Sequence, residues 1–309
     1  PQGQGPGGVH DDIYDQPQGP NDIRGRLQIK DTDIIGDARY FAEIQYVTHD
    51  EPLRNRFNNA SWREVMVTQA DIEGVEPGQE SVAAGQPAIM AWAEIDPNVV
   101  IVSFEDVPGE GRFHLGYRVT DNEDGTWTYE YALHNLNSHR GADGFVVPLP
   151  DGVTASDTGF HDVDYHSGDG HNGGQNFDGT DWPVTVGGGH LRWFVADPFF
   201  NPNANALRWG SMYNFRFTAD APPTTGEIEV SLYRQGSPSS VFVNAAVPET
   251  PVPCAADIAG NDDVVDVNDL LELLANWGGS GNGAQIAEPF DLVEINDLLG
   301  LLGAWGPCS

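Results

Sequence analysis

The chain is poor in basic residues and in cysteine, and it has no long apolar run. Fourteen lysines and arginines stand against 47 aspartates and glutamates, which gives a formal net charge of −33 at pH 7. Such a surface repels phosphate backbones and anionic lipids, so we expect neither nucleic-acid binding nor membrane binding. No apolar stretch approaches the roughly 18 residues that cross a bilayer. The charge suits divalent cations or a saline extracellular setting instead.

Motifs of common catalytic sites are also missing. The sequence contains no GxSxG, HExxH or CxxC pattern, the patterns typical of serine hydrolases, zinc proteases and thiol redox sites. A glycosidase needs two carboxylates roughly 5–10 Å apart, and 47 acidic residues leave that pair undetermined. We therefore name no catalytic residue, and an enzyme is the alternative rather than the first expectation.

The only two cysteines, Cys254 and Cys308, bracket the last part of the chain. A disulfide between them would close a loop of about 55 residues and would stabilise it by roughly 4 kcal/mol through the lost entropy of the unfolded chain. It would leave no free thiol as a nucleophile, and it would point to export into an oxidising compartment. We expect this disulfide, and a protein that is secreted or held at the cell surface.

What the chain does contain in abundance is turn and strand residues. Residues 1–23 are rich in Gly, Pro and Gln, and we expect a flexible N-terminal arm. Residues 24–246 read as strands separated by turns, and the clearest unit is a hairpin over 116–133 around Asp-Gly. The predicted fold is mainly β: one large jelly-roll-like sandwich, or two smaller Ig-like sandwiches divided near 108–112.

Segments rich in β-branched and aromatic residues give the expected strands. They are 39–47, 64–69, 88–95, 98–105, 112–120, 126–133, 144–150, 190–196, 207–219, 227–234 and 240–247. A Pro-rich linker over 247–253 follows, and beyond it the apolar period changes from two to 3.6. A small helical module is therefore expected over 254–309.

This module contains one phrase twice, NDLLELLANWG at 268–278 and NDLLGLLGAWG at 296–306. Each copy predicts a short helix with an Asn-Asp N-cap, a one-sided apolar stripe and a Gly stop. The stripes are Leu270, Leu271, Leu273, Leu274 and Trp277, and Leu298, Leu299, Leu301, Leu302 and Trp305. We expect the helices to pack face to face and to bind a partner through Leu270, Leu271, Leu274, Trp277, Leu298, Leu299, Leu302 and Trp305.

Acidic residues lie in the loop before each helix. The first loop has Asp257, Asp262, Asp263 and Asp266, with Asp269 at the helix start; Asp291, Glu294 and Asp297 follow 28 residues after Asp263, Asp266 and Asp269. Oxygen ligands in a short loop that leads into a helix are what Ca²⁺ prefers. Helix capping and compensation of the helix dipole are the alternative. We expect a calcium ion more in the first loop than in the second.

Residues 254–308 resemble the type I dockerin module, in which paired calcium loops with following helices dock onto cohesin domains. The resemblance implies Asp262 and Asp266 as ligands, the backbone carbonyl of Val264 as another, and Asp269 as the terminal carboxylate. The first loop departs from the family pattern because Asp257 lies one residue too far upstream and Asp263 replaces a glycine. The second loop has Phe290 where an acid is expected.

The body resembles secreted bacterial proteins that carry the same type of tail. The matching phrases are FNNASWREV, DNEDGTWTYEYALHNLNS, FHDVDYHSGD and NANALRWGSMYNFRF. That group has no established activity. The resemblance therefore implies secretion and a β-body but no chemistry.

The segment FHDVDYHSGDGH at 160–171 is a candidate second metal site. On a strand, Asp162, Asp164 and His166 would share one face, and Asp169 or His171 would complete a ligand set for a divalent metal. The alternative is that these acids cap turns in a Gly-rich loop. Trp127, Trp182, Trp193 and Trp209 are candidates for stacking on sugars, although most tryptophans of a sandwich belong to its core.

Two function hypotheses follow. The first is a secreted, non-catalytic structural or adhesive protein, anchored or assembled through the calcium-binding module, with a cohesin-like domain or copies of itself as the partner. Its N-terminal arm would add to a neighbour's open sheet edge. The second is a secreted hydrolase or binding protein for polysaccharide that carries the same docking module.

Overall fold

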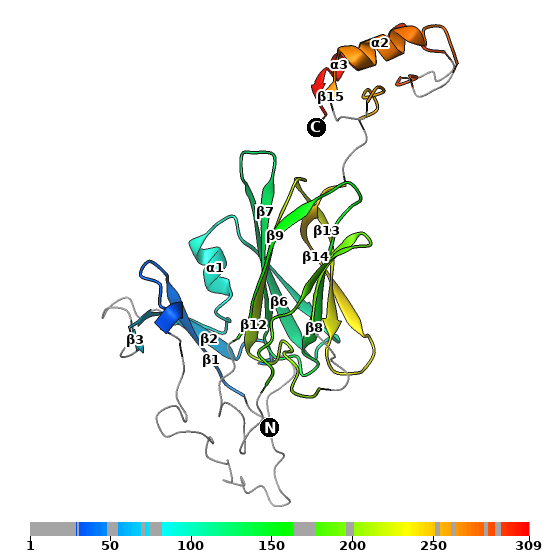
Figure 1. Ribbon diagram of the computed structural model, residues 1–309. Helices are drawn as coiled ribbons and strands as arrows, with labels where there is room; N and C mark the ends of the chain where they lie inside the picture. The colour runs from blue at the N-terminus through cyan, green and yellow to red at the C-terminus, as the bar shows by residue number, and fades with distance from the viewer. Residues whose placement is uncertain are drawn as a thin grey trace, which may run out of the picture. The chain divides into compact units, whose positions relative to one another are not determined.

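The computed structural model describes Ile29 and residues 31–47, 55–68, 72–74, 82–163, 177–195, 201–250, 254–260, 264–280, 284–287 and 292–308 (Figure 1). The predicted N-terminal arm, residues 1–23, lies outside these residues. The chain divides into two compact units, Pro1–Thr250 and Pro251–Ser309. Within the ranges just given, no helix is long and apolar enough to cross a membrane.

Two five-stranded antiparallel sheets form the sandwich of the first unit (Figure 1). One has the order β5 (Val100–Glu105), β6 (Arg112–Asp121), β7 (Trp127–Asn135), β12 (Ser211–Ala219), β9 (Ala155–His161). The other has the order β10 (Val184–Gly187), β11 (His190–Phe194), β8 (Ala142–Pro148), β13 (Pro223–Leu232), β14 (Ser240–Pro248). The prediction of a mainly β protein with a sandwich is confirmed.

Alternation along each strand supplies the core between the sheets. On β12, Tyr213, Phe215 and Phe217 are buried while the residues between them face outward. Phe215 stacks on Phe145 of β8 with the ring centroids 4.3 Å apart, so the two sheets meet through aromatic side chains. One buried cluster joins residues of both sheets, and they therefore form one sandwich rather than two.

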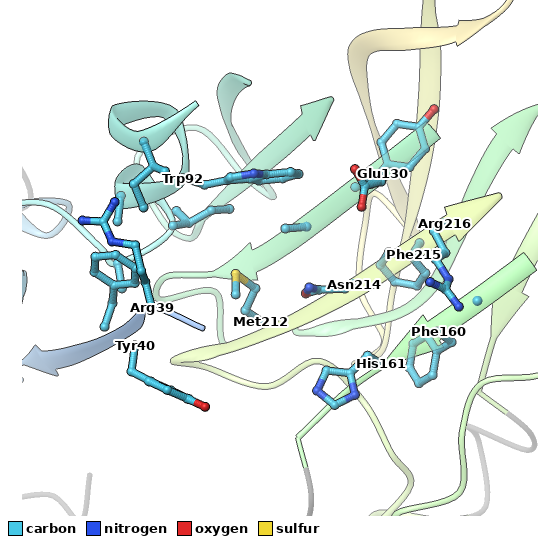
Figure 2. A pocket seen from close by; sticks show the side chains of 18 residues that line it. Arg39, Tyr40, Trp92, Glu130, Phe160, His161, Met212, Asn214, Phe215 and Arg216 are labelled. Carbon is cyan, nitrogen blue, oxygen red and sulfur yellow. The ribbon is translucent and has the colours of Figure 1, made fainter. Parts of the chain in front are cut away.

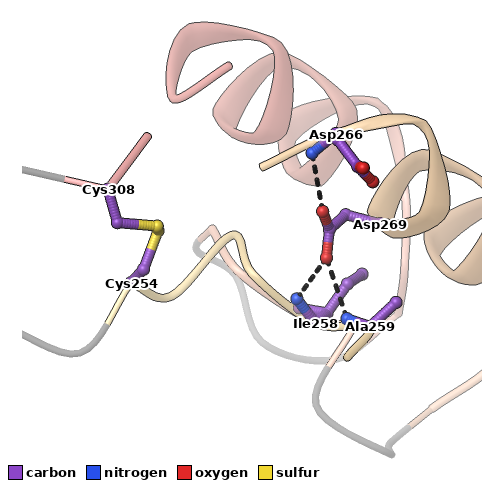
Figure 3. The surroundings of a disulfide bond; sticks show 6 residues. All are labelled: Cys254, Ile258, Ala259, Asp266, Asp269 and Cys308. Atoms are coloured by element: carbon purple, nitrogen blue, oxygen red, sulfur yellow. Dashed lines mark hydrogen bonds between the residues drawn. A yellow bond between two sulfur atoms is a disulfide. The ribbon is translucent and has the colours of Figure 1, made fainter. Parts of the chain in front are cut away.

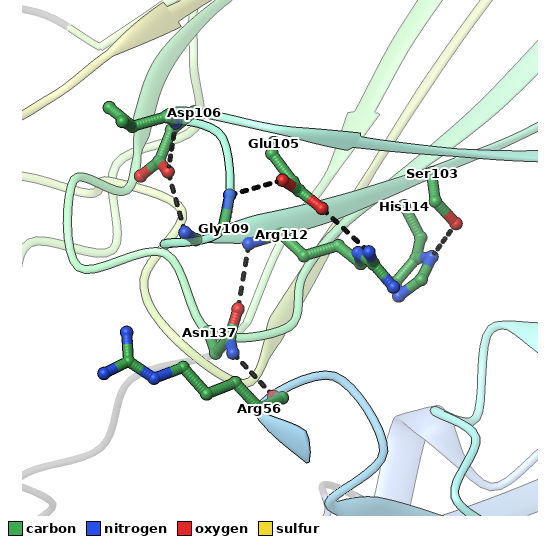
Figure 4. A network of polar contacts seen from close by, with 10 residues as sticks. Arg56, Ser103, Glu105, Asp106, Gly109, Arg112, His114 and Asn137 are labelled. Atoms are coloured by element: carbon green, nitrogen blue, oxygen red, sulfur yellow. Dashed lines mark hydrogen bonds and ion pairs between the residues drawn. The ribbon is translucent and has the colours of Figure 1, made fainter. Parts of the chain in front are cut away.

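The connection between β5 and β6, where we considered a boundary between two sandwiches, is the turn of a hairpin (Figure 4). Asp106 Oδ1 accepts hydrogen bonds from the N–H groups of Val107 at 2.6 Å and Gly111 at 2.9 Å. Glu105 accepts from Gly109 N at 2.7 Å and pairs with Arg112 at 2.8 Å. The adjacent carboxylates of Glu105 and Asp106 thus accept hydrogen bonds from residues along the whole turn.

Residues 88–95, predicted as a strand, form helix α1 over Met90–Ile95, and that prediction is wrong. Met, Ala and Glu favour helix over strand. The Trp92 ring of this helix also packs against the outer face of the first sheet beside Gly116 of β6. An apolar run of eight residues does not by itself distinguish a strand from a helix that packs on a sheet.

A small sheet lies against the outer face of β6 and β7. It contains β1 (Tyr40–Gln45), β2 (Ala60–Val67), β3 (Ile72–Gly74) and β4 (Ala83–Ala84), and it follows the 3₁₀ turn η1 (Asp31–Asp33). Glu43 of β1 accepts from Ala88 N at 2.6 Å and lies 3.6 Å from His134 of β7. Burial, with His134 and Arg112 nearby, lowers the pKa of His114 to about 3, so its ring is neutral here.

The second unit contains helices α2 (Val267–Ala275) and α3 (Ile295–Gly303). The two-residue strands β15 (Val264–Val265) and β16 (Gly306–Pro307) pair antiparallel. Both helices were predicted, and each ends before the Trp-Gly of its repeat. Gly278, with φ of +73°, makes the turn beyond α2.

Candidate functional site

The core of the second unit is built from residues that recur 28 positions apart. Val265 and Val293 are fully buried, and so are Leu273 and Leu301. Ile258 and Ile286, and Leu270 and Leu298, pack partly buried around them. Each helix contributes one fully buried leucine to this core, and Leu270 and Leu298, which were expected at the partner-binding surface, are partly buried.

A buried carboxylate closes the first loop onto its helix (Figure 3). The N–H groups of Ile258 and Ala259 each donate to Oδ1 of Asp269 at 2.8 Å, and the N–H of Asp266 donates to Oδ2 at 2.7 Å. The Asp269 side chain is 0% exposed. One side chain therefore satisfies three backbone donors and fixes the loop to the first turn of α2.

The second loop closes in the same way. Ile286 N and Ala287 N donate to Oδ1 of Asp297 at 2.7 Å and 3.0 Å, and Glu294 N donates to Oδ2 at 2.8 Å. Asp297 is also 0% exposed. Each of the three donors lies 28 residues after its counterpart, so the closure is part of the repeat.

The N-caps differ from the prediction. Asp266 and Glu294, rather than the Asn-Asp pairs, are the N-cap residues, and Asp269 and Asp297 occupy the third helical position of a capping box. Asp266 also accepts from Asn268 N at 2.7 Å. The signal was present in the sequence as an acid followed three residues later by another acid before an apolar run.

Burial and hydrogen bonding act in opposite directions on these two carboxyl groups. Burial raises the pKa of Asp269, but the N–H groups of Asp266, Ala259 and Ile258 outweigh it and hold the pKa below the usual value. The pKa of Asp297 is lowered against its burial in the same manner. Both side chains are therefore ionised at neutral pH.

Cross-pairing and a disulfide hold the two repeats together. β15 in the first loop pairs with β16 after α3, while Val293 in the second loop exchanges hydrogen bonds with Gly278 and Gly279 after α2 at 2.9 and 3.0 Å. Each loop thus pairs with the residues that follow the other helix. The predicted disulfide Cys254–Cys308 is confirmed and joins the start of the first repeat to the end of the second (Figure 3).

The remaining apolar residues of the helices face outward and also come in pairs. We call the following eight side chains the repeated apolar face: Val267, Leu271, Leu274, Trp277, Ile295, Leu299, Leu302 and Trp305. Leu271 and Leu299 are both 60% exposed, and Leu274 and Leu302 are both 49% exposed. The same side of each helix is therefore presented, and it contains six of the eight residues predicted to bind a partner.

The calcium ligands are only partly placed. Asp262, Asp263 and Asp291 lie outside the described residues, whereas Asp257, Val264, Asp266 and Glu294 are described. Among the described residues, no three His, Cys, Asp or Glu side chains lie close enough to hold a metal ion. Calcium binding therefore stays a prediction that depends on Asp262, Asp263 and Asp291.

The second predicted metal site is placed only at its first residue. Asp162 accepts a hydrogen bond from the Asn205 side chain, while Asp164, His166, Asp169 and His171 lie outside the described residues. Of the tryptophans considered for sugar stacking, Trp182 and Trp193 belong to the sandwich core and Trp209 is 38% exposed. Sequence reasoning overlooked Trp92, because it placed that residue on a strand.

Comparisons with known proteins add little. No family model matches the chain, and no curated protein is significantly similar to it. Among solved structures it is similar to a GH20 exo-β-N-acetylglucosaminidase from Vibrio harveyi, determined in complex with N-acetylglucosamine and as an inactive mutant. Each likeness has 14% identity and a TM-score of 0.23 and covers 45% of this chain and 19% of that enzyme. A likeness this weak says nothing about chemistry.

Proposed function

We propose that the C-terminal unit is an extracellular docking module of the dockerin type, which attaches the β-sandwich body non-covalently to a cohesin-like protein partner. The repeated apolar face carries this proposal. The two nine-residue helices expose six large apolar side chains on matching positions, and the tryptophans that follow them, Trp277 and Trp305, add two more. Exposed apolar side chains in such number on a small soluble unit are typical of a protein-binding site.

Charge favours a separate partner over a second copy of the chain. Residues 251–309 contain ten acidic residues and no Lys, Arg or His. Two copies of the unit would bring like charges together around the apolar face, which opposes association. A partner with an apolar patch and a basic rim would complement it. In this proposal the body is the attached, non-catalytic structural or adhesive part.

The disulfide supports a secreted location. Disulfides persist in oxidising compartments and are rare in the cytosol, and the described cysteines are both bridged. The loss of chain entropy in a loop of about 55 residues is worth roughly 4 kcal/mol. So small a core needs such support. Calcium in the first loop would add to it through Asp257, Asp266 and the acids at 262 and 263.

The test is a binding experiment on the full chain. We expect the wild-type protein to bind immobilised cohesin domains in surface plasmon resonance and to sediment as a monomer. The double variant L271D/L299D should weaken binding at least about tenfold, because it buries two charges at the centre of the interface. F242D, which changes a 58% exposed phenylalanine of the first unit, is the matched control.

Two results would contradict the proposal. If no member of a broad cohesin panel binds, the unit is not a docking module of this type. If the wild-type chain self-associates in sedimentation velocity and L271D/L299D abolishes the association, the partner is a second copy. Helix content by circular dichroism verifies that the double variant is folded.

A further inference from the structure

A groove runs across the outer face of the first sheet of the sandwich (Figure 2). Its volume is about 690 Å³, within the range of small-molecule sites. The floor is formed by β7, β12 and β9, and one side by α1 and β1. Its polar and aromatic lining includes Tyr40, Trp92, Glu130, His161, Asn214 and Arg216.

Two glycines of the first sheet, Gly116 of β6 and Gly159 of β9, make room for an aromatic ring and a guanidinium. A Cβ at Gly116 would lie 3.1 Å from Cε3 of Trp92, so the indole ring rests directly on the sheet. A Cβ at Gly159 would lie 2.8 Å from Cγ of Arg216, so that side chain lies across β9. An aromatic ring and a guanidinium are thus seated at opposite ends of the groove, with Asn214 between them (Figure 2).

The guanidinium of Arg216 is available to a ligand. Arg39, the other arginine of the groove, is neutralised by Glu64 through two hydrogen bonds of 2.8 and 2.7 Å. Arg216 has Glu130 as its direct neighbour on β7, yet its guanidinium makes no hydrogen bond or ion pair with any described side chain. The Arg216 side chain is exposed on β12, so a ligand in the groove can reach its guanidinium.

The lining selects the class of ligand. β12 is paired with β7 on one side and with β9 on the other, so a ligand on this face of β12 is recognised through side chains. An indole face takes the apolar C–H face of a sugar ring. Carboxylate, amide and guanidinium groups together offer the acceptors and donors that hydroxyl groups need. Glu130 beside Arg216 leaves no net charge at that end and disfavours an anionic ligand.

We propose that this groove binds a segment of a neutral polysaccharide, with Trp92 stacking on one sugar ring and Glu130, Asn214 and Arg216 hydrogen-bonding to the hydroxyl groups of the next. This goes beyond docking: the body holds a glycan while the C-terminal unit holds a protein. It does not depend on the docking proposal, because all of its residues belong to the first unit.

Affinity electrophoresis of the full-length protein tests the groove. Native gels would contain a neutral β-glucan, a neutral xylan, a neutral mannan, a neutral α-glucan or anionic polygalacturonate. We expect at least one neutral polysaccharide to retard the wild-type protein. R216Q and E130Q change exposed or half-buried side chains on the floor, and each should weaken the retardation about tenfold, the worth of a charged hydrogen bond. R192Q, an exposed strand arginine of the opposite sheet, should behave as wild type.

Three results would overturn the proposal. The first is no retardation by any neutral polysaccharide of the panel. The second is retardation by polygalacturonate alone, which would make the groove a general anion site. The third is retardation that R192Q weakens as much as R216Q, which would place the ligand elsewhere. Unfolding curves of the variants separate loss of binding from loss of fold.

Discussion

The two halves of the C-terminal unit share a framework but differ in their acids. Asp269 and Asp297 accept the same three backbone hydrogen bonds, at 2.7–2.8 Å in the first half and 2.7–3.0 Å in the second. Gln285 and Phe290, however, stand where the first half has Asp257 and Asp262. The closing aspartate therefore belongs to the fold of both halves, and calcium chemistry is expected of one.

The acids of the first loop therefore have two different roles: one satisfies backbone donors, and the others are available to bind a cation. An aspartate that satisfies backbone donors stabilises the loop whether or not an ion is present. Acids elsewhere in the loop repel one another without a cation. We therefore expect the second loop to keep its form without metal, and the first to gain from calcium.

The largest expected effect comes from removing the closing aspartates. D269A and D297A each leave three backbone N–H groups without their acceptor, and each should destabilise the unit by roughly 3 kcal/mol. Because the closure is repeated, the two losses should be alike. Hydrogen exchange measured by mass spectrometry on peptides of α2 and α3 in the full chain reports this local stability.

The neighbouring asparagines provide matched controls for this prediction. Asn268 and Asn296 are exposed one position before each aspartate, and N268A and N296A should change protection by less than about 0.5 kcal/mol. A large loss in D269A with little loss in D297A would show that only the first loop depends on its aspartate. That outcome would contradict the equivalence of the two halves.

Sequence patterns predicted the two helices, the disulfide and the mainly β body, because periodicity and turn chemistry are local signals. They did not predict that Leu270 and Leu298, expected at the partner-binding surface, pack partly buried on the core. An apolar stripe shows which side of a helix can be buried. In so small a unit, the loop residues Val265 and Val293 that pack against the helices determine how much of that side is buried.

The groove illustrates the same limit in the first unit. Its residues come from β1, α1, β7, β9 and β12, and no local pattern connects them. Trp92 was placed on a strand, and the small residues that seat it and Arg216 are ordinary glycines in the sequence. Sites assembled from distant segments require the topology before their members can be recognised.

A smaller effect is expected from calcium, and only in the first half. At a calcium concentration ten times the dissociation constant, binding stabilises the unit by about 1.4 kcal/mol. D266N keeps an N-cap acceptor but removes a charge from the first loop, and it should abolish the gain in protection that calcium gives over chelator. E294Q makes the matching change in the second loop and should leave the gain unaltered.

The calcium experiment distinguishes a calcium site in the acidic loop from diffuse screening and from helix capping. An equal gain in wild type, D266N and E294Q would indicate diffuse screening of the acidic surface rather than a site. If calcium gives the wild-type chain no gain in protection, the acids of the loop act only as helix caps. If E294Q also abolishes the gain in protection that calcium gives, both halves bind calcium.

The smallest expected effect is that of pH, and it should again be equal in the two halves. Hydrogen bonds hold the pKa of Asp269 and Asp297 below the usual value of about 3.9. Their contribution to stability is therefore present above that value and is lost as the pH falls through the lowered pKa of the folded state. The loss is smaller than in D269A, because a protonated carboxyl group still accepts through its carbonyl oxygen. Carboxyl ¹³C titration of the full chain, with signals assigned by D269N and D297N, should give two lowered values; an ordinary value for one of them would show that its loop is open in solution.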